Sequence, residues 1–355
     1  MDLISGRSKG FLPSAARAVL LAMSGPYFLA MRLRRWACRR GCFRSRQPAA
    51  PVISVGNLTT GGAGKTPMVA WVVGRLQQAG FRPAVLTRGY RASGGVSDEA
   101  SLLSRLCHPA PVMVNPDRWA GAQQASRTGA DVLVMDDGFQ HLRLRRQLDI
   151  VMVDASEPFG FGHVLPRGLL REPLSALQDA DAVVLTRTDA VSAARLEQVL
   201  DVLRKHTRGA TFHSTVHRPS RIVDQDGREH DVNSLAGRRV LAFCGLGNPD
   251  AFFDTLRRLG ADLAGEVAFE DHARYDAARL AKLARQARAC GAELLVTTAK
   301  DRVKLPGVDQ AFAPAGLPPL PLWTLEIALE FVEGGQALLD RILSVRLGSL
   351  QSASR

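Results

Sequence analysis

The chain has 355 residues, long for a single domain, and 46% of them are hydrophobic, which excludes wholesale disorder. Lysine and arginine outnumber aspartate and glutamate by 46 to 34, giving a formal net charge of +12. This excess indicates an anionic partner: a nucleic acid, a phosphorylated substrate or an acidic membrane face. The five scattered cysteines do not form a disulfide framework and are typical of a reducing cytoplasm.

The N-terminal 46 residues combine an apolar run with a basic flank. Ala18–Met31 contains no charged residue, but its 14 residues fall short of the about 20 that a spanning helix needs. Seven arginines follow from Arg32 to Arg46, a pattern that anionic headgroups on the cytoplasmic side attract. We expect residues 1–46 to form a membrane-associated helix and basic segment; an ordinary amphipathic helix packed on the domain is the alternative. Nucleotide binding is expected not to need this segment.

Beyond a short QPAAP linker, apolar strands alternate with helical stretches, which predicts a mostly parallel sheet covered on both faces. The strands expected in this part are Val52–Val55, Pro83–Leu86, Ala130–Met135, Asp149–Val153 and Ala182–Leu185, and a helix is expected at Lys65–Ala79.

Around Asp226-Gly227 the pattern changes to short alternating segments, which predict a hairpin or β-ribbon. Strands then follow at Arg239–Phe243 and Glu293–Thr297, with helices at Pro249–Leu259 and Asp276–Cys290. The expected fold is α/β: a P-loop NTPase-like α/β/α sandwich at 47–210, a β-ribbon linker at 211–236, and a second, smaller α/β/α domain at 237–350.

A glycine-rich loop follows the first expected strand, with the sequence Thr59-Thr60-Gly61-Gly62-Ala63-Gly64-Lys65-Thr66. In such a loop, backbone N–H groups and the positive end of the following helix dipole converge on the phosphates of a nucleotide. Lys65 is expected to reach the β- and γ-phosphates of ATP, and the Thr66 hydroxyl to bind Mg²⁺. Thr59 stands where the usual G-x4-G-K-[ST] pattern has glycine, so the strand–loop–helix context identifies the motif.

Two aspartates, Asp136 and Asp137, end the apolar run that begins at Val132. A phosphate loop needs a carboxylate for Mg²⁺, normally at the end of a neighbouring strand. Aspartates at strand ends also cap helices and form turns, so this pair indicates a metal site only in combination with the phosphate loop. We expect both to serve the metal and the phosphates, and the sequence does not decide which of them touches the metal.

Three classes of nucleotide-binding protein remain open at this point. Membrane-associated ATPases of the partitioning type have a similar loop, but they carry a signature lysine where this chain has Thr60. A nucleic-acid-dependent NTPase would suit the charge, but aromatic residues make up only 6% and no nucleic-acid module is recognisable, so no nucleic acid partner is expected. A small-group kinase needs a base for its acceptor hydroxyl and a second wall to enclose it.

Short segments over nearly the whole chain decide among these classes, because in order they resemble those of the tetraacyldisaccharide 4′-kinases, the lipid A 4′-kinases of Gram-negative bacteria. The matching segments are Ser54–Thr59, Gly62–Pro67, Thr87–Arg91, Ser97–Glu99, Pro116–Arg118, Asp136–His141, Leu170–Pro173, Arg187–Asp189, Cys244–Pro249, Asp271-His272, Thr297-Thr298 and Lys300-Asp301.

The resemblance implies two α/β/α domains joined by a β-ribbon, an active site in the cleft between them, and an N-terminal membrane-associated helix. It implies transfer of the γ-phosphate of ATP, with Mg²⁺, to the 4′-hydroxyl of a tetraacylated glucosamine disaccharide 1-phosphate. The expected partners are this lipid A disaccharide 1-phosphate precursor and an anionic membrane surface, at the cytoplasmic face of the bacterial inner membrane. No obligate protein partner is expected.

The resemblance also implies roles for individual residues. Asp98 would be the base for the acceptor hydroxyl, and His272 would hold and polarise it as a dyad partner. Glu99 would be a second carboxylate on the metal or base side. The residues expected to line the substrate site are Gln140, His141, Arg171 and Glu172. For the last two, a surface ion pair is the alternative.

Overall fold

The computed structural model describes residues 2–5, 8, 10–43, 45–89, 97–270, 273, 275–305 and 320–353. The chain divides into two compact units. Unit 1 comprises residues 1–91, 103–217 and 329–355, and unit 2 comprises residues 92–102 and 218–328. The C-terminal residues thus return to unit 1.

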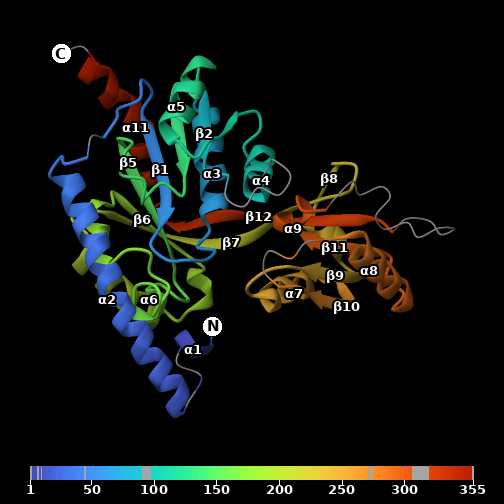
Figure 1. Ribbon diagram of the computed structural model, residues 1–355. Helices are drawn as coiled ribbons and strands as arrows, with labels where there is room; N and C mark the ends of the chain where they lie inside the picture. The colour runs from blue at the N-terminus through green and yellow to red at the C-terminus, as the bar shows by residue number, and fades with distance from the viewer. Residues whose placement is uncertain are drawn as a thin grey trace. The chain divides into compact units, whose positions relative to one another are not determined.

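Unit 1 is built on a parallel sheet with the strand order β3-β2-β4-β1-β5-β6-β7 (Figure 1). The strands are β1 (Val52–Asn57), β2 (Pro83–Thr87), β3 (Val112–Val114), β4 (Val132–Asp136), β5 (Leu148–Asp154), β6 (Ala182–Thr186) and the first part of β7 (Thr211–Val223). β1 lies between β4 and β5, and the chain crosses to β2 on one side and later to β5 on the other. Such a switch point is where parallel sheets bind ligands, beyond the carboxyl ends of the strands.

Helices cover both faces of this sheet. On one face, α3 (Lys65–Gln78) packs against β1, and α11 (Gly335–Ala353) packs beside α3 in the same hydrophobic core. On the other face, α5 (Arg118–Arg127) packs against Val52, and α6 (Ala193–His206) packs against β5 and β6. The strands are buried throughout, as expected for runs of valine, isoleucine and leucine between two helical layers. Unit 1 is therefore an α/β/α sandwich, as the sequence predicted.

Unit 2 repeats this architecture on a smaller scale. Its sheet has the order β10-β9-β11-β12 with parallel pairs, and α7 and α8 pack on opposite faces. The elements are β9 (Arg239–Cys244), α7 (Pro249–Arg258), β10 (Asp262–Ala268), α8 (Ala277–Ala289), β11 (Leu294–Thr298), α9 (Ala299–Arg302) and the first part of β12 (Leu322–Glu333). β8 (Glu229–His230) pairs antiparallel with the second part of β7, across a turn that contains Asp226 and Gly227. The hairpin expected there is present.

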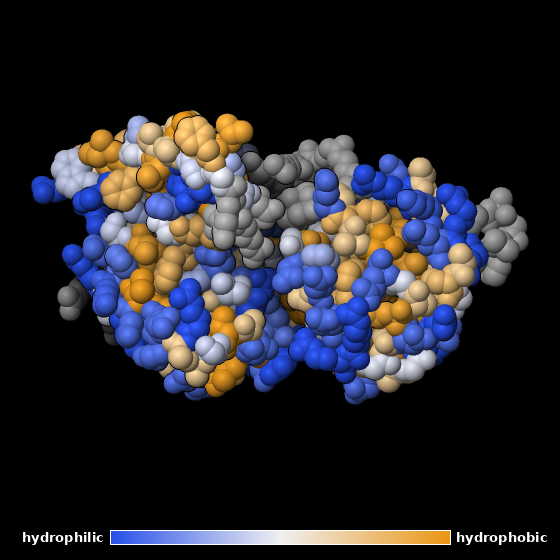
Figure 2. Space-filling model, turned by 90° about the horizontal axis from the view of Figure 1, so that it is seen from below, coloured by the Kyte–Doolittle hydropathy of each residue, from blue (hydrophilic) through white to orange (hydrophobic). Residues whose placement is uncertain are grey.

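The remaining helices are α1 (Asp2–Ser5), α2 (Phe11–Arg39) and α4 (Asp98–Leu106), with short 3₁₀ turns at Gly160–Gly162, Leu174–Asp179, Thr188–Ala190 and Val232–Leu235. By length and composition alone, α2 is long and apolar enough to cross a membrane. One side of α2 packs on unit 1 and buries Ser24 and Arg35. The rest of its surface exposes large apolar side chains: Phe11, Leu12, Val19, Leu21, Met23, Phe28, Leu29, Leu33 and Trp36. Apolar side chains gather at the upper left of the face drawn in Figure 2.

Candidate active site

The glycine-rich loop connects the end of β1 at Asn57 to the start of α3 at Lys65. Gly61 and Gly62 are exposed, whereas Ala63 is buried. Gly64 has φ +82°, and a Cβ added there would lie 3.1 Å from His217 Nε2 and 3.2 Å from Thr186 Cγ2. Only glycine suits this backbone and this space. The loop thus turns directly into the N-terminus of α3, whose free N–H groups and dipole favour an anion.

A second segment runs beside the loop. Thr60 N donates to Leu169 O at 2.7 Å, and Arg171 N donates to Leu58 O at 2.7 Å. The side-chain amide of Asn57 donates to Thr59 O at 2.9 Å and steadies the turn from inside. The backbone of the 169–171 segment is therefore tied to the first residues of the loop, which places Arg171 next to it.

Two cations and one carboxylate meet at the mouth of the loop. Lys65 Nζ donates to Asn57 Oδ1 at 3.1 Å and lies 3.4 Å from Asp137 Oδ1. Arg171 Nη1 donates to both oxygens of the same Asp137, at 2.8 and 3.0 Å. Asp137 has φ 49°, a left-handed conformation that aspartate tolerates, directly after the end of β4. The trio carries one net positive charge, added to the positive end of the α3 dipole.

Asp137 is ionised at neutral pH. Burial alone would raise the pKa of its carboxyl, but the charges and hydrogen bonds of Lys65 and Arg171 outweigh burial, so the pKa lies below its ordinary value.

Asp136 is the last residue of β4, and it pairs in register with Val55 of β1. Its side chain is buried and accepts a hydrogen bond from Thr87 Oγ1 at 3.3 Å, while Arg118 donates to its backbone carbonyl at 3.0 Å. Carboxylate and hydroxyl oxygens are the ligands that Mg²⁺ prefers, and Mg²⁺ commonly takes one or two carboxylates together with phosphates and water. The donor set of Asp136, Asp137 and Thr66 fits such an ion. Within the described residues, no group of three or more acidic, histidine or cysteine side chains forms a ready-made metal cage.

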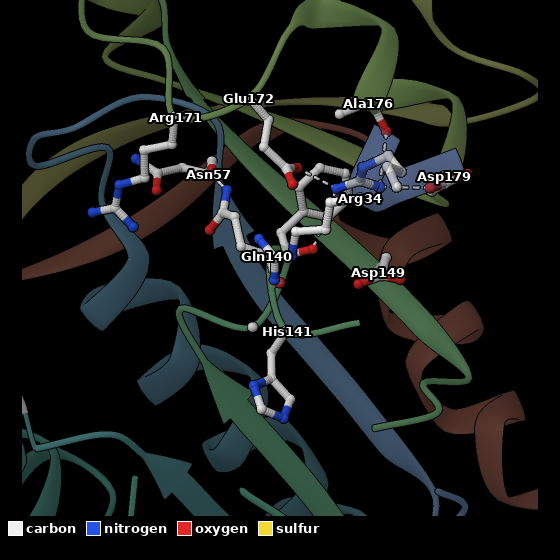
Figure 3. Close-up of polar contacts among 12 residues, drawn as sticks. Arg34, Asn57, Gln140, His141, Asp149, Arg171, Glu172, Ala176 and Asp179 are labelled. Carbon is white, nitrogen blue, oxygen red and sulfur yellow. Dashed lines mark hydrogen bonds and ion pairs between the residues drawn. The ribbon is translucent and has the colours of Figure 1, made fainter. Parts of the chain in front are cut away.

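The segment after Asp137 is pressed against β1. A Cβ on Gly56 would lie 2.6 Å from Phe139 Cβ, so glycine is required for this close approach. Gln140 Nε2 donates to Asn57 O at 2.7 Å (Figure 3). Burial, and then the charges of Arg118, Arg146 and Arg34, lower the pKa of His141 to about 4, so its imidazole is neutral at physiological pH.

Glu172 was expected to line the substrate site, but its side chain points into the protein. Its residue is 1% exposed, and its carboxylate forms an ion pair with Arg35 of α2. Figure 3 shows Glu172, Ala176 and Asp179 converging on the segment of α2 next to Arg34. The sequence predicted no role for Asn57. Arg35 was expected, with the other arginines of its cluster, to meet anionic headgroups, and this was wrong, because its side chain is buried against Glu172. Asn57 could have been noticed as the polar end of an apolar strand, whereas no local pattern marks Arg35 within a run of arginines.

The expected base lies on a different part of the chain. Asp98 is exposed at the first position of α4, within the 92–102 range of unit 2, and Glu99 beside it is half-buried. Ser97 Oγ accepts the backbone N–H of Ala100 at 3.1 Å and caps this helix. His272 lies outside the described residues, so the Asp98–His272 pairing stays a prediction.

Comparisons with known proteins agree on one relationship. The family model for tetraacyldisaccharide-1-P 4′-kinase matches residues 16–346. A tetraacyldisaccharide 4′-kinase of Geobacter metallireducens is 42% identical over 307 residues, which cover 81% of this chain and 88% of that protein. One of Anaeromyxobacter dehalogenans is 42% identical over 325 residues, covering 86% and 85%. The crystal structure of LpxK from Aquifex aeolicus in complex with ATP matches with a TM-score of 0.73 at 26% identity, over 93% of this chain and 99% of that one.

Proposed function

Since the chain belongs to the tetraacyldisaccharide 4′-kinase family, we propose the following account of how its residues carry out that reaction. The enzyme phosphorylates the 4′-hydroxyl of a tetraacylated glucosamine disaccharide 1-phosphate in lipid A biosynthesis. ATP supplies the γ-phosphoryl group, and ADP leaves. The observation that supports the assignment best is the cluster of Lys65, Asp137 and Arg171 at the N-terminus of α3.

In this proposal the loop from Thr59 to Thr66 holds the nucleotide. Its backbone N–H groups and the α3 dipole bind the phosphates, and Lys65 neutralises charge on the group in transfer. Arg171 is the second cation for that charge. Asp136, Asp137 and Thr66 would hold Mg²⁺, which would neutralise negative charge on the phosphates of ATP.

The acceptor side of the proposal rests on family resemblance. Asp98 takes the proton of the 4′-hydroxyl. The 4′-oxygen forms a bond to the γ-phosphorus of ATP, and the bond between that phosphorus and the bridging oxygen breaks, so that ADP leaves. His272 orients Asp98, and Glu99 stands beside the base. Gln140 and neutral His141 would contact the sugar or its phosphate as hydrogen-bonding groups.

Membrane association fits the exposed side of α2. Its apolar side chains can enter a lipid interface, and the exposed arginines Arg32, Arg40 and Arg46 can contact anionic headgroups. We place the enzyme at the cytoplasmic face of the inner membrane, where its lipid acceptor would be presented.

A direct assay tests the proposal. Full-length protein is incubated with Mg-ATP and a tetraacyldisaccharide 1-phosphate in mixed micelles, and the expected product is the bis-phosphorylated lipid, formed one for one with ADP. The matched control is the acceptor that already carries a 4′-phosphate, which should support no ATP turnover. ATP hydrolysis that ignores the lipid, with no phospholipid product, would instead favour a P-loop ATPase switch.

A further inference from the structure

Three side chains of α2 contact the two segments that build the phosphate site. Tyr27 OH donates to Arg171 O at 2.8 Å, and Arg34 Nη2 donates to Gln140 O at 2.6 Å (Figure 3). Arg35 binds Glu172, the residue next to Arg171. The helix that carries the apolar exposed surface therefore also touches the catalytic edge of unit 1.

Arg35 is the centre of these contacts. It is 6% exposed, and besides the ion pair with Glu172 it lies 2.5 Å from Asp179 Oδ2. Its guanidinium also lies over the ring of Phe139, 4.8 Å from the ring centroid. A planar guanidinium can hold two carboxylates and an aromatic face at once, which an ammonium group cannot do.

The partners of Arg35 lie close in the chain to both members of the Arg171–Asp137 ion pair. Glu172 directly follows Arg171, and Phe139 comes two residues after Asp137. Arg171 and Asp137 bind each other at the mouth of the loop. Glu172 and Phe139 are buried, so a displacement of Arg35 would shift both chain segments rather than one flexible side chain.

We propose that Arg35 is a positioning residue of the kinase, which fixes the Arg171–Asp137 pair relative to Lys65 from beneath the site. α2 is then part of the phosphate site as well as the membrane-contacting element. Glu172 acts through Arg35 and does not touch substrate. These contacts argue against the expectation that residues 1–46 can be removed without affecting the nucleotide site. The inference rests on the proposed function.

The test separates positioning from lipid binding. In the full-length protein, Arg35→Met and Arg35→Lys are compared on a short-chain, soluble acceptor. A misplacement of about 1 Å costs about 10²-fold in rate, so we expect kcat of Arg35→Met to fall about that much, with KM values for ATP and acceptor near those of the wild type. Arg35→Lys should lose less, because it keeps the charge but not the fork. Flotation with anionic liposomes should match the wild type.

Arg341→Met is the matched control. Arg341 attaches another helix, α11, to unit 1 by donating to Asp181 O at 2.8 Å, just before β6 and so at the opposite end of the sheet from the loop. Its kcat should stay at the wild-type level. In a double-mutant cycle, Arg35→Met combined with Glu172→Gln should lose about as much as the worse single variant, because the two act as one unit.

Near-UV circular dichroism establishes folding, and if Arg35→Met fails to fold, Arg35→Lys decides. Wild-type kcat in folded Arg35→Lys and Arg35→Met on the soluble acceptor, with any loss confined to the long-chain lipid acceptor, would overturn the inference. A wild-type protein without lipid kinase activity would overturn the proposed function instead, so the two failures are distinct.

Discussion

The two units share an architecture but use the same position in it differently. In each, an interior parallel strand runs into a glycine-containing loop that leads to a helix: β1 to α3 in unit 1, and β9 to α7 in unit 2. In unit 1 the helix begins with Lys65, whose ammonium group stands at the loop mouth with Asp137 and Arg171. These two cations and one carboxylate leave a net positive charge at the partly exposed mouth of the loop.

In unit 2 the loop is closed by a carboxylate from the protein itself. Asp301 is 0% exposed, and it accepts Gly245 N at 2.9 Å and Thr298 Oγ1 at 2.7 Å. Lys304 Nζ, itself buried, lies 2.9 Å from its other oxygen. The Gly245 N–H, which could bind an anion, is already bonded to the Asp301 carboxylate, and the same carboxylate neutralises the charge of Lys304. An α/β/α layer architecture is therefore not sufficient for a phosphate site. The loop must also carry net positive charge that the protein's own carboxylates do not neutralise.

Removing the Lys65 charge from the loop of unit 1 is the most severe test of this contrast. Lys65→Ala should lower kcat by on the order of 10³–10⁵-fold, the range for cations that stabilise a phosphoryl group in transfer. The measurement is phospholipid formation, with thermal unfolding as the check on the fold. Lys205→Ala, an exposed lysine near the end of α6, is the control and should be unaffected. Near-normal turnover of folded Lys65→Ala would remove the phosphate-loop assignment.

The second test concerns Asp98 and His272, which lie outside the phosphate loop and are expected to contribute to catalysis as the base and its partner. Asp98→Ala and His272→Ala should each lower kcat by about 10²–10⁴-fold, the contribution of general-base catalysis. If they form a dyad, the double variant should lose far less than the product of the two losses. Multiplicative losses in single-turnover kinetics would show that the residues act separately.

The sequence was sufficient for seven buried strands, because their signal is local, but β3 and β10 were not predicted. Each expected strand is observed within two residues of its expected bounds, since runs such as Val132–Met135 need burial on both faces. α5, α6 and α11 were not predicted. α5 has a low share of apolar residues, and it is held in place by packing on β2 and β3, which no local pattern reveals. β12 was also missed, because Glu326, Glu330 and Glu333 interrupt its apolar residues.

The phosphate loop could also be predicted, because its residues are consecutive in the sequence. The residues that pair with its charged side chains could not be predicted. Nothing in the spacing shows that Arg171 lies against Asp137, 34 residues away, or that Arg35 lies against Glu172, 137 residues away. Glu172 was expected to line the substrate site because family resemblance implied that role, but its carboxylate is buried against Arg35, and no local pattern shows this.

Breaking the closed loop of unit 2 should affect stability rather than nucleotide binding. Asp301→Asn leaves the buried Lys304 charge without its counterion, and such losses cost about 3–5 kcal/mol. We expect that decrease in the free energy of unfolding, measured by denaturant titration, with an unchanged KM for ATP. Adding Lys304→Met should recover part of the loss. A raised KM for ATP with unchanged stability would mean that unit 2 binds nucleotide.

The histidine beneath the unit 1 loop gives a smaller, pH-dependent effect. Burial, followed by the charge of Arg187, lowers the pKa of His217 from 6.5 to about 4. Between these values the unfolded chain binds a proton that the folded chain does not, so stability falls as pH drops from about 6.5 to about 4. At 1.36 kcal/mol per pKa unit, the loss is at most about 3 kcal/mol. His217→Gln should therefore lose less stability than the wild type between pH 7 and pH 4.5. An equal loss in chemical denaturation would contradict it.

The smallest expected effect concerns which unit meets the membrane. α2 belongs to unit 1, so the lipid surface should hold the unit that carries the phosphate loop. Arg32 is exposed on α2 and stacks over Phe28, 5.6 Å from its ring centroid, within the apolar surface. An arginine near an anionic surface contributes about 1 kcal/mol, so Arg32→Ala should weaken binding to anionic liposomes about fivefold at low salt and hardly at all at high salt. Arg204→Ala removes an equally exposed arginine from α6 and should float as the wild type does. Equal losses in both variants would mean that net charge, and not α2, drives binding.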